Sequence, residues 1–320
     1  MNKFIELENN HLKVVLSTFG AGIYQIYLKT DTLVPVLVTP SSPDDFIKNT
    51  NYYGVTIGRT SGRLFGPSYS MDNKIFPVTC NPNSPFMLHG GAFGFWAQPF
   101  EVLTQESAVL VLKHISQPTP TFAGVLDIEV KYTLLDKTVK IEYKAHSTED
   151  TLCNITNHAY FNLNLNNGTI LDHVLHLNAS KYIKLDEDYR FVSIDSVFDK
   201  PFDYKTPKRL GNGVLALKNT AQKGLDHCFI KDDSAFIGTL YEPLSKRRLS
   251  VFSDYPSVVI YTHNFQSKKP LNTDVDGGIY SSITFECQFE PDGIHHPSLN
   301  TAQLRKNEIY QHYIDFQFEF

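Results

Sequence analysis

Hydrophobic and polar residues alternate along residues 125–145, and this period of two constrains the fold more than any other feature of the sequence. From Leu126 to Leu134 the even positions are apolar and most odd positions are polar. After Leu135-Asp136-Lys137 the alternation resumes, with apolar residues at the odd positions. Successive side chains of a strand point to opposite faces, so each run predicts a strand with one buried and one wet face. The short polar link between the two runs predicts an antiparallel hairpin.

Strand patterns also cover much of the rest of the chain. Further strands are predicted at 12–16, 107–115, 171–179, 248–252, 257–262 and 282–289. Helical periodicity is weak and predicts only short turns, at 41–48 and 301–308. No linker or fixed repeat divides the chain, so we expect a mainly β protein with a single domain, residues 1–320, built as one large antiparallel β-sandwich. The longest irregular stretch, about 59–99, is expected to contribute functional loops.

Composition excludes several classes of protein. The 320 residues are 42% hydrophobic, with 29 Lys+Arg, 34 Asp+Glu and a formal net charge of −5. Nucleic-acid binding usually needs a basic face, so this mild acidity argues against it. No apolar run is long enough to span a membrane, and charges interrupt the start of the chain where a signal peptide would be apolar. The four cysteines are widely spaced, so we expect reduced thiols in a cytoplasmic protein.

Several short segments combine reactive side chains with glycine or aromatic residues. In the first, Arg59 and Arg63 could hold an oxygen-rich ligand, although a solvated surface turn fits this segment better when it is taken alone. In the second, His89 precedes two glycines, which lets the backbone approach a ligand closely or simply anchors a turn. In the third, Asn157 and His158 lie among aromatic residues and predict a buried polar network that is either catalytic or structural.

Two further carboxylates complete the candidates. Glu286 shares one face of a predicted strand with Thr284 and Gln288, and the strand alone favours a side chain in water. Asp226 and His227 follow a glycine in a predicted turn. A zinc site at His173 and His176 is disfavoured, because a strand would point the two rings to opposite faces. Motifs for nucleotide cofactors and for a serine-hydrolase nucleophile are absent from the sequence.

Taken in order, these segments resemble the aldose 1-epimerase, or galactose mutarotase, family over nearly the whole chain. The matching pieces are Gly58-Arg59 with Arg63, Leu88-His89-Gly90-Gly91 with Gly94-Phe95, Asn157-His158 with Tyr160-Phe161-Asn162-Leu163, Asp226-His227, and Glu286 with Gln288 and Pro291-Asp292. The resemblance implies an antiparallel β-sandwich and an isomerase that interconverts the α and β anomers of free aldoses such as glucose or galactose. The expected partner is therefore a small aldose. Whether the protein is a monomer or a homodimer stays open.

The resemblance also implies roles for individual residues. Glu286 would be the catalytic base and His158 the acid, and their roles would swap on ring closure. His89 would hydrogen-bond near the ring oxygen, while Arg63 and Asp226 would bind sugar hydroxyls. No metal or organic cofactor is implied, because the reaction involves no redox change.

The chain departs from the family pattern at two positions that usually bind hydroxyl groups. Gly62 stands where asparagine is usual, and Val259 stands where glutamine is usual. These changes favour broader aldose use, to include glucose, galactose and maltose. Trp96 is interpreted as a packing residue in preference to a platform for a second sugar.

Three alternatives remain. A glycoside hydrolase would use Asp226 and Glu286 as its carboxylate pair. A non-catalytic carbohydrate-binding protein would have no need for both His158 and Glu286. A hexose-phosphate epimerase would need a cationic pocket, for which Lys205, Lys208 and Arg209 are the clustered candidates.

Overall fold

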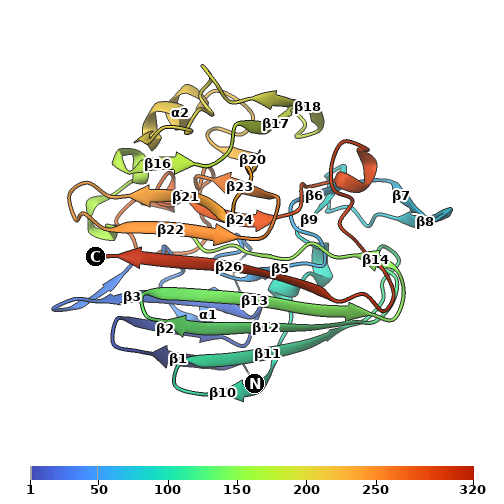
Figure 1. The fold of residues 1–320 in the computed structure, drawn as a ribbon, viewed down its shortest axis with the longest axis horizontal. Coiled ribbons are helices and arrows are strands. Elements are labelled where there is room, and N and C mark those ends of the chain that lie inside the picture. Colours follow the sequence, from blue (N-terminus) through green and yellow to red (C-terminus); the bar gives the residue numbers. More distant parts are fainter. Residues whose placement is uncertain (1, 49) are drawn as a thin grey trace.

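The computed structural model describes residues 2–48 and 50–320, and strands dominate it (Figure 1). The chain begins with a four-stranded antiparallel sheet, in the order β1 (Phe4–Glu8), β2 (Leu12–Ser17), β3 (Gly22–Lys29) and β4 (Leu33–Pro35). Alternate residues of β2 are buried, so one face of this sheet packs on the core.

A nine-stranded antiparallel sheet forms the largest layer (Figure 1). Its spatial order is β10 (Glu101–Gln105), β11 (Val109–Ser116), β12 (Leu126–Leu135), β13 (Thr138–Ser147), β26 (Tyr310–Glu319), β22 (Arg248–Ser253), β21 (Phe236–Tyr241), β16 (Val174–Leu177) and β19 (Lys208–Arg209). The predicted hairpin is present as β12–β13, with Leu135 opposite Thr138 at its turn. The C-terminal strand β26 lies between β13 and β22, so it joins the early and late halves of the sheet.

A five-stranded sheet positions the site. Its order is β18 (Phe191–Ser196), β17 (Lys181–Leu185), β20 (Asp226–Ile230), β23 (Ser257–Tyr261) and β24 (Thr284–Gln288). Phe285 of β24 packs on Phe161, which in turn contacts Phe316 of β26 at 4.8 Å between ring centroids. The main hydrophobic core contains residues of the five-stranded, nine-stranded and four-stranded sheets, packed face to face as a β-sandwich requires.

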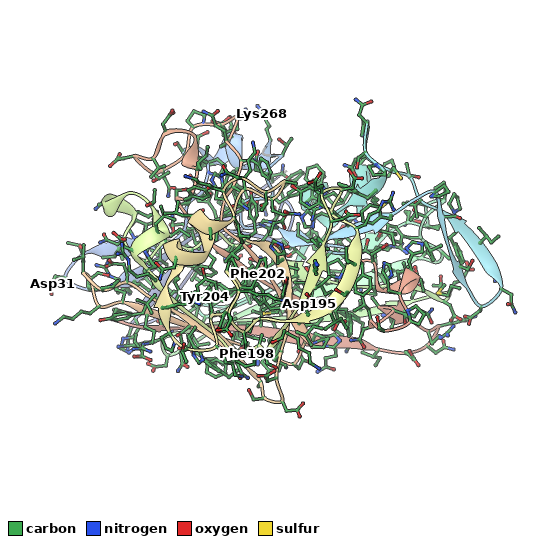
Figure 2. The ribbon with its side chains drawn as sticks, turned by 90° about the horizontal axis from the view of Figure 1, so that it is seen from above. Asp31, Asp195, Phe198, Phe202, Tyr204 and Lys268 are labelled. Atoms are coloured by element: carbon green, nitrogen blue, oxygen red, sulfur yellow. The ribbon has the colours of Figure 1, made fainter. Side chains whose placement is uncertain are left out.

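The segment after β18 packs against this five-stranded sheet, and Figure 2 looks down on it. Phe202 stacks on Tyr182 of β17 at 4.1 Å and contacts His227 of β20 at 4.6 Å. Phe198, labelled nearby, is exposed.

Short pairs and helices complete the fold. The two-stranded sheets are β14 (Thr151–Leu152) with β25 (Gln303–Leu304), β15 (Thr156–Asn157) with β5 (Thr56–Ile57), β6 (Arg63–Phe65) with β9 (Phe86–Leu88), and β7 (Ser68–Met71) with β8 (Lys74–Pro77). The α-helices are α1 (Pro43–Ile47) and α2 (Leu210–Ala216). The 3-10 helices are η1 (Gly91–Phe93), η2 (Phe95–Ala97), η3 (Leu165–Asn167), η4 (Ile170–Asp172), η5 (Asp276–Gly278) and η6 (Gly293–His295). In the described part of the chain, no helix has the length and apolar character needed to cross a membrane.

The predicted β-sandwich is confirmed, and so is the helical turn within 41–48, which is α1. The turn predicted at 301–308 is wrong, because Gln303 and Leu304 form β25 and pair with β14. The stretch 59–99 is more ordered than expected: it contains the pairs β6–β9 and β7–β8. These strands are too short to show a clear period of two in the sequence.

Candidate active site

A cavity of about 270 Å³ lies where the five-stranded sheet meets the β6–β9 pair. The five site residues named from the sequence all line it: Arg63, His89, His158, Asp226 and Glu286. They come from three parts of the fold, so the tertiary structure brings together residues that are more than 200 positions apart in the chain.

Glu286 lies in the middle of β24, directly opposite Val259 of β23. Its side chain is only 3% exposed, so the expectation from the strand alone, a carboxylate in water, is wrong. Both faces of β24 are buried, because one face packs on the core and the other forms the cavity. Thr284 donates a hydrogen bond from its hydroxyl to Glu286 Oε1 at 3.3 Å.

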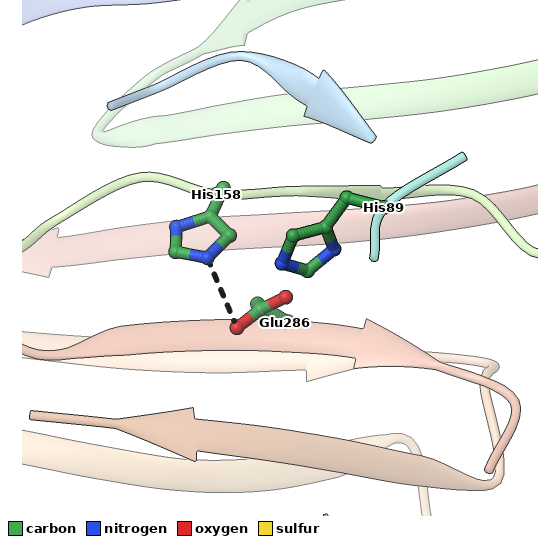
Figure 3. A group of neighbouring side chains, drawn as sticks. All are labelled: His89, His158 and Glu286. Atoms are coloured by element: carbon green, nitrogen blue, oxygen red, sulfur yellow. Dashed lines mark ion pairs between the residues drawn. The ribbon is translucent and has the colours of Figure 1, made fainter. Parts of the chain in front are cut away.

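His158 follows β15 and faces Glu286. Its backbone N–H donates to Val55 O at 3.0 Å, and its carbonyl accepts from Gly54 N–H at 2.9 Å. These two bonds hold the backbone of His158 from both sides. Its ring atom Nε2 lies 3.4 Å from Glu286 Oε1, as the dashed line in Figure 3 marks.

His89 lies on the same side of Glu286 as His158 (Figure 3), with 5.3 Å between the two ring centroids. The following residue must be glycine: Gly90 has φ +79°, and a Cβ there would lie 2.1 Å from Gly58 O. Gly62 N–H donates to His89 Nδ1 at 3.2 Å, so in the neutral ring the proton is on Nε2. His89 can therefore donate a hydrogen bond into the site.

Arg63 begins β6, and Asp226 begins β20. Arg63 donates from Nη2 to Asp226 Oδ2 at 3.0 Å, and both side chains are largely buried. The guanidinium carbon lies 3.9 Å from the Tyr189 ring centroid and 5.3 Å from that of Phe86. Arg63 Nε is buried and has no hydrogen-bond partner among the described residues. Because Arg63 lines the cavity, the guanidinium donors that Asp226 does not use are available there.

Burial governs the charges of the central pair. Burial, followed by the negative charge of Asp226, raises the pKa of Glu286 to about 8. Burial lowers the pKa of His158 to about 4. Burial, then the charges of His158 and Arg63, holds the pKa of His89 well below its ordinary value. At neutral pH the Glu286–His158 pair therefore holds one proton.

A metal ion fits this group poorly. His89, His158 and Glu286 each offer a ligand atom, and these atoms lie within 4.8 Å of one another. However, His89 Nδ1 already accepts the Gly62 N–H, and its Nε2 then carries a proton. Binding through either nitrogen would cost the Gly62 hydrogen bond, so the donor set is better suited to moving protons than to holding a cation.

The comparisons with known proteins point to one family. The family model for aldose 1-epimerases matches residues 3–317. The chain belongs to the aldose 1-epimerase family. An aldose 1-epimerase from Haemophilus influenzae is 27% identical over 327 residues, covering 99% of this chain and 96% of its own. A maltose epimerase from Levilactobacillus brevis is 26% identical over 328 residues, covering 99% and 95%. Among solved structures, an aldose epimerase homologue from C. elegans has the same fold, with a TM-score of 0.91, 24% identity and coverage of 100% and 99%.

Some residues in the motifs of this aldose 1-epimerase family member lie outside the cavity. Arg59 is buried, does not line the cavity, and donates to backbone carbonyls and to Ser116 Oγ. His227 faces away from the cavity onto Phe202. Trp96 does not line the cavity, and its Nε1 donates to Gly91 O at 3.1 Å.

Other cavity residues were missed by the sequence analysis. Tyr189 stacks on Arg63, and Tyr52 contacts the His89 ring at 4.6 Å between centroids. Both tyrosines have positive φ and lie in loops, so no strand period could have marked them. A tyrosine beside a glycine, as at Tyr52-Tyr53-Gly54, is too common to stand out.

Proposed function

We propose that this protein is a mutarotase that uses Glu286 and His158 as its acid–base pair on a free aldose such as glucose or galactose. The observation that carries the proposal is the buried contact of 3.4 Å between His158 Nε2 and Glu286 Oε1. Family membership makes the protein a carbohydrate isomerase. The geometry supplies the two groups that anomer exchange needs.

The reaction opens the sugar ring and closes it on the other face. Glu286 takes the proton of the C1 hydroxyl while His158 gives a proton to the ring oxygen. The bond between C1 and the ring oxygen breaks, and C1 becomes an aldehyde. After rotation about the C1–C2 bond, His158 removes the proton from the C5 hydroxyl as that oxygen attacks C1, and Glu286 returns a proton to the carbonyl oxygen. Atoms, electrons and protons balance over the cycle, so the residues present suffice.

The pair must hold one proton for this chemistry. Transfer of that proton from Glu286 to His158 gives the form in which the carboxylate is the base and the imidazolium is the acid. His89 would donate from Nε2 to the sugar near the ring oxygen, which stabilises the charge that develops there. Arg63 and Asp226 would bind hydroxyl groups and hold the ring in place.

A sugar-phosphate substrate is less well supported. Arg63 is the one Lys or Arg among the described residues that line the cavity, and it is already paired with Asp226. Of the clustered cations named from the sequence, Lys205 pairs with Asp232 and Arg209 with Asp172. Neither contributes to the cavity.

Polarimetry tests the proposal. Freshly dissolved α-D-glucose, α-D-galactose and α-maltose are followed with wild-type protein, with Glu286→Gln and without protein. We expect wild-type protein to accelerate mutarotation of more than one of these sugars, because Gly62 and Val259 offer no side-chain hydrogen bonds that would select one. Glu286→Gln should lose at least about 100-fold in kcat, since it removes the base. The control is Glu101→Gln, which makes the same substitution at an exposed position of β10 and should keep wild-type activity. Full activity in Glu286→Gln would contradict the assigned base.

A further inference from the structure

The cavity is lined by polar and by apolar groups. The polar groups include the catalytic candidates and the Arg63–Asp226 pair. The apolar groups form a wall of five residues that line the cavity and belong to one hydrophobic cluster: Ile183, Leu185, Phe191, Cys228 and Val259. A free aldose carries hydroxyl groups on nearly every carbon, so only its C–H groups, or a carbon that lacks a hydroxyl, suit this wall.

Strand register places the apolar wall beside the catalytic carboxylate. Val259 lies directly opposite Glu286 on one side and directly opposite Cys228 on the other. Directly opposed side chains on neighbouring strands have Cβ atoms about 5 Å apart. A sugar whose C1 hydroxyl contacts Glu286 therefore lies within reach of Val259, and Cys228 is the next side chain across the sheet.

Two polar groups that line the cavity beside this wall, the Asp292 carboxylate and the Tyr189 hydroxyl, are already engaged. Asp292 Oδ1 accepts from Phe65 N–H at 2.9 Å and contacts His295 Nδ1 at 2.7 Å, and Oδ2 contacts His296 Nε2 at 3.2 Å. The Tyr189 hydroxyl donates to Ala221 O at 3.1 Å. A sugar hydroxyl directed at the wall would therefore lose water without gaining a partner from the wall or from these two groups.

The geometry points to a substrate class: the apolar wall formed by Ile183, Leu185, Phe191, Cys228 and Val259 selects deoxyaldoses, in which one hydroxyl of the hexose is replaced by hydrogen. This inference rests on the proposed mutarotase function and names the sugars that the same site prefers. A deoxy carbon or a methyl group gains from burial against the wall, whereas a hydroxyl there pays an uncompensated desolvation cost. Apolar pockets reject an added hydroxyl by up to about 100-fold.

The test compares deoxyaldoses with their parent sugars. Polarimetry from pure anomers gives kcat/KM for glucose, 2-deoxyglucose, 6-deoxyglucose, galactose and 6-deoxygalactose, each corrected for the rate without protein. We expect at least one deoxyaldose to exceed its parent by about tenfold or more in kcat/KM.

Variants of the wall show whether it causes the preference. Val259→Gln places an amide opposite Glu286 and should reverse the preference, by raising kcat/KM for the parent sugar and lowering it for the deoxyaldose. Cys228→Ser is close to isosteric and should reduce the preference even if Val259→Gln folds poorly. Val259→Ile keeps the wall apolar and is the matched control, in which the preference should persist.

The outcomes separate this inference from the proposed function. Accelerated mutarotation of the parent sugars with no deoxyaldose preference would overturn the inference and leave the function standing. A deoxyaldose preference that is unchanged in both Val259→Gln and Cys228→Ser would also overturn it, because the wall would then not be its cause. Failure to accelerate mutarotation of any of the five sugars would count against the mutarotase function itself.

Discussion

Arg63 shows how single residues make this site work. Its guanidinium group lies between the rings of Tyr189 and Phe86 and is paired with Asp226. Stacking on an aromatic face restrains the plane of the guanidinium group and leaves its edge free for hydrogen bonds. Tyr189 thus acts as a positioning residue for Arg63, although it belongs to the loop between β17 and β18.

Replacing Tyr189 tests this role. Tyr189→Leu should raise KM about five- to tenfold with kcat within about twofold, since a cation–π contact contributes roughly 1 kcal/mol to holding Arg63 in place. Tyr189→Phe keeps the ring and should restore a KM close to that of the wild-type protein. Steady-state polarimetry separates KM from kcat. A fall in kcat with no change in KM would show that Tyr189 acts on the chemical step instead.

The shared proton of Glu286 and His158 sets the expected pH dependence. Below about pH 4 both groups are protonated and there is no base; above about pH 8 neither is protonated and there is no acid. We therefore expect kcat/KM to be level between about pH 4 and 8 and to fall outside this window. Polarimetric rates measured across this pH range, and corrected for catalysis by the buffer, give the profile of kcat/KM. Limbs near the ordinary values, 4.5 for Glu and 6.5 for His, would show that burial does not shift these groups.

At the scale of elements, the site depends on hydrogen bonds that anchor the segment leading into Arg63. Arg59 is 3% exposed and donates to Ser116 Oγ and to the carbonyl oxygens of Ser116, Gln117, Ala123 and Gly124. It therefore ties the segment that leads into Arg63 to the connection between β11 and β12. A charged donor with this many buried acceptors is costly to remove, because each carbonyl loses its partner.

Removal of this anchor should be mainly a stability effect. Arg59→Met is expected to lower the free energy of unfolding by about 3 kcal/mol or more, since hydrogen bonds to charged groups contribute roughly 1.5–3 kcal/mol each. Arg248→Met makes the same substitution at an arginine in an exposed ion pair with Glu319. It should change the free energy of unfolding by less than about 1 kcal/mol. Denaturant unfolding measures both variants. Equal stability of the two would contradict the anchoring role.

At the scale of the molecule, the site lies between the five-stranded sheet and the short strand pairs that cross it. The inner face of the five-stranded sheet packs on the core, and its other face supplies Asp226, Val259 and Glu286 to the cavity. The β6–β9 pair and the β5–β15 pair bring Arg63, His89 and His158 over that face. A rigid sheet with loops across it is a common way to hold reactive groups in fixed positions.

Sequence alone determined a good part of this result. Alternation predicted the β12–β13 hairpin, and strand patterns predicted others such as β2, β11 and β22, because that signal is local and each strand carries its own period. The long strands β3 and β26 were not predicted. The order of motifs predicted the five site residues, all of which line one cavity. The weak signals were the short strands between residues 59 and 99 and the half-buried tyrosines in loops, where too few residues repeat to show a period.

Only the tertiary structure decided how these residues act on one another. The strand containing Glu286 predicted a carboxylate in water, yet packing of β24 on both faces buries the carboxylate and raises its pKa to about 8. The contact with His158 depends on which strands become neighbours, and nothing within a single strand encodes that choice. The apolar wall has the same origin, because Val259 and Cys228 line the cavity only through the register that aligns them with Glu286.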